Sequence, residues 1–164
     1  MKKVLLALAI LSSVIYADST NGQGLYAGAG LGIMATDKNG DAGLGLSLRG
    51  GAALDNVLKG LGIQAELNKS ISDPEYRNGF DIDVMTLAAY ATFDINIPNS
   101  AVSLRPKIGA IFPNMNDDID SRDLILSSGF GMTYAVESNL RLYADYTVLG
   151  EAISNYSVGV EIKF

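Results

Sequence analysis

The stretch that decides the fold is Tyr156-Ser157-Val158-Gly159-Val160-Glu161-Ile162-Lys163-Phe164. Every second residue, counted back from Phe164, is apolar, and the residues between them are small or charged. Because successive side chains of a β-strand point to opposite faces, this alternation predicts a strand with one apolar and one polar face. A strand that runs to an aromatic last residue is unusual for a soluble domain, whose ends commonly fray. The final strand of a soluble sheet is the alternative interpretation.

The composition fits one domain whose apolar residues alternate with polar ones. The chain has 164 residues, of which 48% are hydrophobic and only 18% are charged. Beyond the amino-terminus, no stretch approaches the roughly 20 apolar residues that a membrane-spanning helix needs. The apolar residues are therefore spread along strands.

The amino-terminus has the pattern of a secretory signal peptide. Lys2 and Lys3 precede an apolar run over residues 4–15, and small residues follow it. We expect cleavage after Ala17, which makes residues 1–17 the signal peptide and residues 18–164 the mature domain. The alternative is a permanent anchor, but the apolar run is short for a membrane span and two serines interrupt it. Cleavage would change the formal net charge from −6 to −8, since 12 basic residues become 10 against 18 acidic ones.

What the chain lacks excludes several classes of function. There is no cysteine, which excludes disulfides and thiolate metal sites. There is no histidine, the commonest general base and metal ligand. The acidic net charge argues against nucleic acid as a partner. We therefore expect no enzymatic activity and no cofactor.

Seven further segments alternate in the same way and predict seven more strands. Their approximate ranges are 25–34, 44–54, 61–68, a segment ending near 93, 102–112, 124–136 and 140–148. Polar connections rich in glycine, proline, asparagine and aspartate separate them. No mature segment has a helical period, so the sequence predicts an all-β fold of eight strands.

The polar face of these strands is mostly glycine, serine and threonine, with few large charged residues. Such a face suits the narrow interior of an eight-stranded barrel better than the water-exposed surface of a sandwich. We expect the small residues to make room for Tyr26 and Arg49. The glycines concerned are Gly28, Gly30, Gly32, Gly43 and Gly45.

The connections fit a barrel that has both termini on one side of a membrane. Residues 55–60, 94–101 and 137–139 would be inner turns. Residues 36–41, 72–80, 114–123 and 149–155 would be outer loops. Aromatic residues would then gather near the two boundaries, with Phe93, Tyr134 and Phe164 on the inner side and Phe112 and Tyr156 on the outer side.

Residues 24–32 read GLYAGAGLG, residues 104–110 read LRPKIGA, and residues 140–150 read LRLYADYTVLG. These segments resemble the first, fifth and seventh strands of small OmpA/OmpX-type outer-membrane barrels, in which a proline near the start of the fifth strand is tolerated. The closing strand is similar to the carboxy-terminal signal that the outer-membrane assembly machinery recognises. The residues of that signal are Tyr156, Val158, Val160, Ile162 and Phe164.

The resemblance implies an eight-stranded antiparallel up-and-down transmembrane β-barrel in the outer membrane of a Gram-negative bacterium. Expected partners are outer-membrane lipid, lipopolysaccharide and the assembly machinery, and we expect a monomer. The peptidoglycan-binding domain of OmpA has no counterpart after Phe164, so tethering to the cell wall is not implied.

Charged residues on the inward face form the candidate site. They are Arg49, Glu66, Arg105, Lys107, Arg141, Asp145 and Glu161, with Lys163 near the rim. If Leu54 opposes Leu61 across the turn, Arg49 opposes Glu66, which predicts an ion pair that plugs the lumen. Arg141 and Glu161 form a second possible pair. OmpA-type barrels are similarly closed by interior ion pairs; the alternative is that the charges solvate a small wet cavity.

The third outer loop is acidic and is a weak candidate for a cation site. Its polar residues are Asn116, Asp117, Asp118, Asp120 and Asp123. Carboxylates at this spacing suit Ca²⁺ or a divalent bridge to lipopolysaccharide. The loop lacks the glycine and distal glutamate of a helix-loop-helix calcium site, so a solvated acidic loop is favoured over a metal site.

Together these patterns favour an outer-membrane barrel with a structural or surface-interaction role and a largely plugged polar lumen. Three alternatives stay open: a low-conductance pore for small solutes, an adhesion or host-interaction protein that acts through its outer loops, and a secreted soluble ligand-binding barrel.

Overall fold

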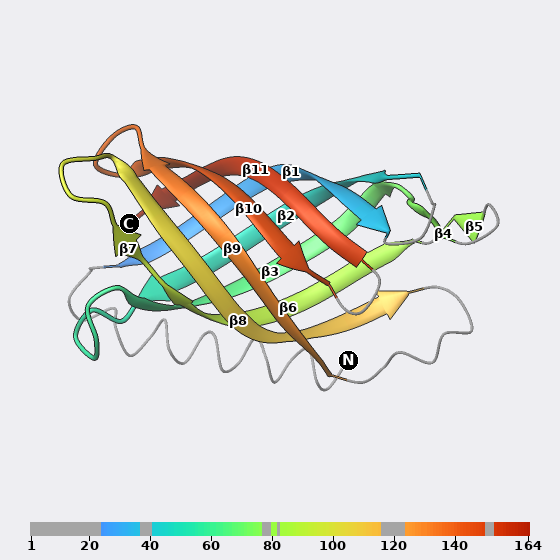
Figure 1. Ribbon diagram of the computed structural model, residues 1–164, viewed down its shortest axis with the longest axis horizontal. Coiled ribbons are helices and arrows are strands. Elements are labelled where there is room, and N and C mark those ends of the chain that lie inside the picture. Colours follow the sequence, from blue (N-terminus) through green and yellow to red (C-terminus); the bar gives the residue numbers. More distant parts are fainter. Residues whose placement is uncertain (1–23, 37–40, 77–79, 82, 116–123, 150–152) are drawn as a thin grey trace.

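The computed structural model describes residues 24–36, 41–76, 80–81, 83–115, 124–149 and 153–164 (Figure 1). The predicted signal peptide over residues 1–17 and most of the acidic loop over 114–123 lie outside the described residues. Within them, no helix is long and apolar enough to cross a membrane.

Eight long strands form the barrel. They are β1 (Leu25–Thr36), β2 (Gly43–Ala53), β3 (Leu61–Ser72), β6 (Val84–Phe93), β8 (Val102–Met115), β9 (Ile125–Ala135), β10 (Leu140–Val148) and β11 (Ile153–Lys163). Each pairs antiparallel with its neighbours in the order β6-β3-β2-β1-β11-β10-β9-β8. The pairing of β6 with β8 closes the sheet on itself. The predicted eight-stranded all-β barrel is thereby confirmed.

Three short strands lie at the ends of the barrel. β4 (Glu75–Tyr76) and β5 (Phe80–Asp81) pair with each other, and β7 (Ile95–Asn96) pairs antiparallel with the first residues of β8. β4 and β5 therefore occupy part of the segment predicted as the loop 72–80. The segment predicted as the loop 149–155 also differs, because β11 already begins at Ile153.

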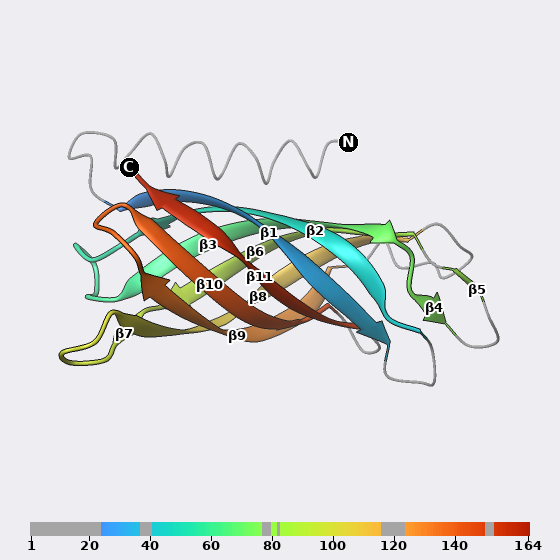
Figure 2. The ribbon, with the colours of Figure 1, turned by 90° about the horizontal axis from the view of Figure 1, so that it is seen from above.

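The first and the last strand of the barrel place the two ends of the described chain on the same side. β1 begins and β11 ends at the same end of the barrel, where the connections from β2 to β3, β7 to β8 and β9 to β10 also lie (Figures 1 and 2). We call this the turn end and the opposite one the loop end. At the turn end, the carboxylate of Asp55 accepts a hydrogen bond from the Gly60 amide at 2.7 Å, and Gly60 has a φ of +88° that favours glycine.

The outward face is apolar, as the alternation predicts. Leu126, Val158 and Leu31 are 73%, 62% and 60% exposed, and the band that they belong to runs around the barrel. Phe93, Tyr134 and Phe164 are exposed toward the turn end, and Tyr156 is exposed near the loop end beside Tyr146, with ring centroids 5.0 Å apart. Phe112, which the sequence places near the outer boundary with Tyr156, is half-buried and thus less exposed than Tyr156.

Glycines on the inward face lie against the largest interior side chains. A Cβ at Gly28 would lie 3.2 Å from Cγ of Arg49, and a Cβ at Gly129 would lie 2.7 Å from Cε of Lys107. Room for Arg49 is thus made by one of the predicted glycines. Room for Tyr26 is made instead by Gly51, where a Cβ would lie 2.5 Å from the tyrosine hydroxyl.

Candidate functional site

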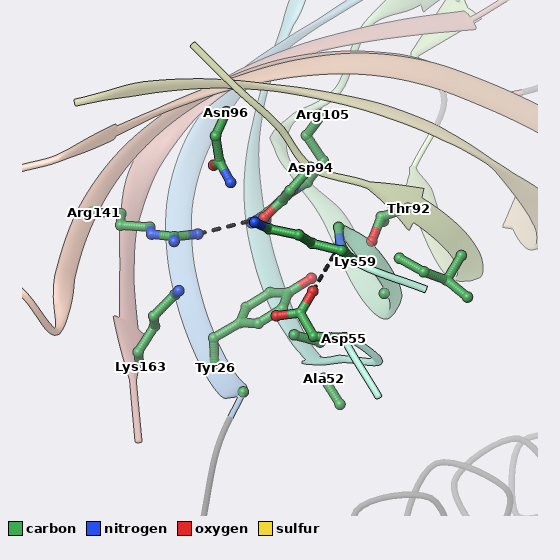
Figure 3. Close-up of a pocket in the computed structure, with 15 residues that line it drawn as sticks. Tyr26, Ala52, Asp55, Lys59, Thr92, Asp94, Asn96, Arg105, Arg141 and Lys163 are labelled. Carbon is green, nitrogen blue, oxygen red and sulfur yellow. Dashed lines mark hydrogen bonds and ion pairs between the residues drawn. The ribbon is translucent and has the colours of Figure 1, made fainter. Parts of the chain in front are cut away.

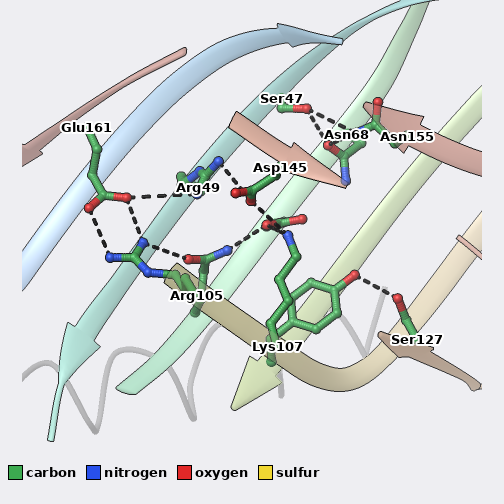
Figure 4. Close-up of polar contacts among 12 residues, drawn as sticks. Ser47, Arg49, Asn68, Arg105, Lys107, Ser127, Asp145, Asn155 and Glu161 are labelled. Carbon is green, nitrogen blue, oxygen red and sulfur yellow. Dashed lines mark hydrogen bonds and ion pairs between the residues drawn. The ribbon is translucent and has the colours of Figure 1, made fainter. Parts of the chain in front are cut away.

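Three cations and three carboxylates are buried together inside the barrel (Figure 4). They are Arg49, Arg105, Lys107, Glu66, Asp145 and Glu161, none of which is more than 6% exposed. We call these six residues the charged layer. Equal numbers of opposite charges make the layer formally neutral, which reduces the cost of holding the charges away from water.

Asp145 on β10 holds two of the three cations. Its Oδ2 lies 3.0 Å from Nη2 of Arg49 and 3.0 Å from Nζ of Lys107. Lys107 also donates to Glu66, so these contacts link β2, β3, β8 and β10 across the lumen.

Glu161 on β11 holds the third cation. Nη1 of Arg105 donates to its Oε2 at 2.9 Å, and Nη1 of Arg49 lies 3.8 Å from the same oxygen. Arg105 also forms a bidentate pair with Asp94, at 2.6 and 3.0 Å. Asp94 follows β6 at the turn end, so Arg105 connects the charged layer to that rim.

The predicted pairs are formed only in part. The register opposes Arg49 and Glu66 as the sequence predicts. Among the described residues, however, Arg49 pairs with Asp145 and Glu161, whereas Glu66 pairs with Lys107. The prediction of a direct Arg49–Glu66 ion pair is wrong, because partners from across the narrow lumen reach these side chains.

The other predicted pair, Arg141 and Glu161, is formed only at long distance. The two residues are opposed in register, and their charged atoms are 3.9 Å apart. Arg141 also lies 3.5 Å from Asp94. All seven predicted inward charges thus line the lumen, but their partners are set by the closed barrel.

Each buried cation lies over a tyrosine ring. The guanidinium carbon of Arg49 is 3.2 Å from the ring centroid of Tyr143, and that of Arg105 is 5.0 Å from that of Tyr26. Nζ of Lys107 is 4.9 Å from the ring centroid of Tyr90. The rings supply cation–π attraction in addition to the carboxylates. The roles of Tyr90 and Tyr143 were not predicted from the sequence, although both residues alternate inward.

Neutral polar side chains continue the network. The Tyr26 hydroxyl donates to Gln64 at 2.7 Å, and the Gln64 amide donates to Glu66 at 2.5 Å. Toward the loop end, Asn68 accepts from Ser47 at 2.5 Å and from Asn155 at 3.3 Å (Figure 4). In the part of the chain that the structure describes, four buried polar atoms lack a protein hydrogen-bond partner, namely Arg49 Nη1, Tyr143 Oη, Asp145 Oδ1 and Asn155 Oδ1. Internal water commonly satisfies such atoms.

An apolar cluster lies beyond the amides, toward the loop end. Its buried members are Met34, Val84, Ala88, Tyr90, Ile111, Leu149 and Ile153. We call these seven residues the apolar cap. This cluster was not predicted from the sequence, because Leu149 and Ile153 fall in the segment 149–155 that was expected to be an outer loop.

No metal site is found in the described parts of the chain, which contain no group of three acidic, histidine or cysteine residues suited to an ion. The weak candidate residues Asp117, Asp118 and Asp120 lie outside the described residues.

An apolar outer face around a closed, antiparallel barrel with a polar interior defines a transmembrane β-barrel. The chain belongs to the outer membrane protein beta-barrel domain family, whose model matches residues 4–164. Comparison with curated protein sequences gives no match.

Solved structures share the fold at low sequence identity. Neisserial surface protein A is 17% identical, with a TM-score of 0.58 over 85% of this chain and 96% of that one. The amino-terminal barrel of Pseudomonas aeruginosa OprF is 14% identical, with a TM-score of 0.58 over 88% and 100%. Ail of Yersinia pestis, in complex with the heparin analogue sucrose octasulfate, is 16% identical, with a TM-score of 0.53 over 86% and 97%.

Proposed function

We propose that this protein is an outer-membrane barrel with a structural or surface-interaction role, and that its lumen is closed to solutes. The observation that carries the proposal is the filling of the interior by the charged layer and the apolar cap in series. A solute that crossed the barrel would have to separate buried ion pairs and then displace packed apolar side chains.

Burial makes the ion pairs of the charged layer costly to separate. Separating one partner from a buried ion pair costs roughly 3–5 kcal/mol, because an uncompensated charge is left in a medium of low dielectric constant. Asp145 holds two cations at once, so its displacement would leave both Arg49 and Lys107 short of a partner. Thermal opening of this layer would therefore be rare.

A closed lumen leaves the outer face and the loops as the surfaces that act. The outer face contacts lipid, and the closing strand, from Tyr156 to Phe164, would be read by the assembly machinery. The segment 114–123 contains Asp117, Asp118, Asp120 and Asp123. These carboxylates favour a cationic partner or a divalent bridge to lipopolysaccharide. Ail was crystallised with a polyanion, and the acidic segment of this chain favours partners of the opposite charge.

A low-conductance pore is the second candidate. Buried polar atoms without a protein partner, among them Arg49 Nη1 and Asp145 Oδ1, favour some water inside the charged layer. The contact of Arg49 with Glu161, at 3.8 Å, is also longer than a hydrogen bond.

Recordings in planar lipid bilayers test the closed lumen. The wild-type barrel is expected to give no sustained current steps. Glu66→Ala removes a partner of Lys107 and shortens a side chain in the layer, so brief current steps are expected to appear if the charged layer is the main plug. Glu137→Gln, which removes a carboxylate from an exposed turn, is the control and is expected to resemble wild type. Sustained conductance by the wild-type barrel would contradict the closed lumen, and a silent Glu66→Ala variant would contradict the idea that the charged layer is the plug.

Export and membrane insertion are tested together in cells. Amino-terminal sequencing of the mature protein is expected to begin at Asp18. The protein in the outer-membrane fraction is expected to migrate differently on a gel before and after boiling, as a folded barrel does. Recovery of the protein from the soluble periplasmic fraction would refute this location.

A further inference from the structure

A small cavity lies at the turn end of the barrel, next to Arg105 of the charged layer (Figure 3). Its volume is about 140 Å³, roughly ten times the 10–15 Å³ or so that one water molecule requires. Arg105 lines its inner part, where pairs with Asp94 and Glu161 hold the guanidinium. Tyr26 and Thr92 line its walls. We call this cavity the vestibule.

Cations outnumber carboxylates around this vestibule. Lys59, Arg105, Arg141 and Lys163 line it, against Asp55 and Asp94. This local excess occurs in a chain whose formal net charge is −6. Asp94 is engaged by two hydrogen bonds from Arg105, and Asp55 accepts from the Gly60 amide. The carboxylates present are therefore already partnered.

Three of the cations keep donors available. Among the described residues, Lys59 and Lys163 have no carboxylate within ion-pair distance. Arg141 reaches carboxylates only at 3.5 and 3.9 Å, and its side chain is 17% exposed. Figure 3 shows Arg141 and Lys163 on neighbouring strands, with their charged ends directed into the cavity. The vestibule therefore presents a planar guanidinium beside at least one ammonium group.

We propose that the vestibule is a binding site for a phosphate group presented from the turn end. A guanidinium recognises two oxygens of a phosphate at once, and ammonium groups add point charges without a fixed geometry. Thr92 and Asn96 add neutral polar groups to the lining. Two sources carry this chemistry, namely free inorganic phosphate and the headgroup of an anionic phospholipid in the adjoining leaflet.

Lys163 and Arg141 are the binding residues to test. The refolded full-length mature barrel, in a zwitterionic detergent, is titrated with inorganic phosphate, and binding is followed by the backbone and side-chain NMR shifts of the turn end. Saturable shifts are expected around Gly60 and Lys163, and added sodium chloride should weaken them. Lys163→Gln and Arg141→Gln are each expected to weaken binding at least tenfold.

Lys69→Gln is the matched control, since Lys69 lies near the loop end and is paired with the exposed Asp83. This variant should bind phosphate as wild type does. Altered gel mobility before boiling verifies that each variant folds, and the two separate test variants guard against the failure of one. The absence of saturable binding by the folded wild type, or binding that neither Lys163→Gln nor Arg141→Gln weakens, would overturn the proposal.

Nanodiscs distinguish the two sources of phosphate. The titration is repeated in discs of phosphatidylcholine and in discs that contain phosphatidylglycerol. Equal affinity in both means that free phosphate is the ligand. The other outcome is that the wild type binds phosphate more weakly in the phosphatidylglycerol discs, whereas Lys163→Gln binds it equally in both kinds of disc. This outcome means that the headgroup competes for the vestibule. Either result supports the site.

Discussion

The two halves of the lumen are filled by opposite kinds of chemistry. The half nearer the turn end contains the charged layer, in which every buried cation contacts a carboxylate and lies over a tyrosine ring. The half nearer the loop end contains the apolar cap, in which Met34, Val84 and Ile111 have no exposed surface. Both halves exclude solvent, but they depend on different properties of their side chains.

The difference concerns how each half tolerates change. An apolar core depends mainly on volume, and a lost methyl group leaves a cavity. A buried ionic layer depends on the partner of every charge, so the loss of one carboxylate strands a cation. The charged half should therefore be the more sensitive to single substitutions.

Asp145→Asn is expected to have the largest effect. The substitution keeps the shape of the side chain but removes the charge that Arg49 and Lys107 share at 3.0 Å. We expect a loss of about 3–5 kcal/mol in the free energy of unfolding. Urea titration in lipid vesicles, read by gel mobility without boiling, measures it. Glu137→Gln is the control, and equal stability of both variants would contradict the comparison.

Ile111→Ala tests the apolar half. The side chain is fully buried in the cap, so truncation should cost roughly 2–5 kcal/mol. Ile108→Ala on the same strand is the matched control, because Ile108 faces outward and is 57% exposed. Lipid can fill the space at position 108, and a much smaller loss is expected there. Unfolding in urea compares the two variants, and equal losses would show that the cap is not packed.

Val158→Arg extends the comparison to the outer face. Val158 lies in the middle of β11 and is 62% exposed, so an arginine there would meet the membrane interior. The expected cost is about 2–4 kcal/mol, against at most about 1 kcal/mol for Val136→Arg at the turn end. The same urea titration measures both, and a cost that does not depend on depth would argue against lipid on this face.

The exposed ion pair of Lys69 and Asp83 gives the smallest effect. Nζ of Lys69 lies 2.8 Å from Oδ1 of Asp83, and the side chains are 50% and 38% exposed. The hydrogen bonds from Lys69 lower the pKa of Asp83. The stabilisation is therefore present above the ordinary aspartate pKa of about 3.9 and is lost as pH falls through the lowered value.

Solvent screening limits this contribution to less than about 1 kcal/mol. Asp83→Asn should cost that amount at neutral pH and nothing at a pH below the lowered pKa. Unfolding measured at both pH values verifies this. A larger loss at neutral pH than for Asp145→Asn would reverse the contrast between buried and exposed pairs.

Much of the fold is predictable from local pattern. A period of two separates the faces, so the outward position of Val158 and the inward position of Glu161 follow from the alternation alone. The opposition of Arg49 and Glu66 also follows, because a short turn sets the register of the two strands that it joins. The beginning of β11 was less predictable. Its first three residues, Ile153, Ser154 and Asn155, are all buried, so burial does not alternate there as it does in the rest of the strand.

The partners of the inward charges could not be predicted in the same way. Arg49 reaches Asp145, which is 96 positions later in the chain, and Lys107 joins Glu66 across the lumen. Such contacts depend on the diameter of the barrel and the stagger of its strands, which no local period encodes.

The sequence by itself determined the eight strands, which face of each meets lipid, and which charges enter the lumen, because side-chain alternation is a local property of an extended chain. Only the tertiary structure decided that Arg49 pairs with Asp145 rather than Glu66, that Ile111 and Leu149 build an apolar cap, and that Arg141 and Lys163 meet at one vestibule. The physical reason is closure. When the first and last strands pair, residues distant in sequence are confined to one narrow interior, and each charge takes the nearest opposite charge across it.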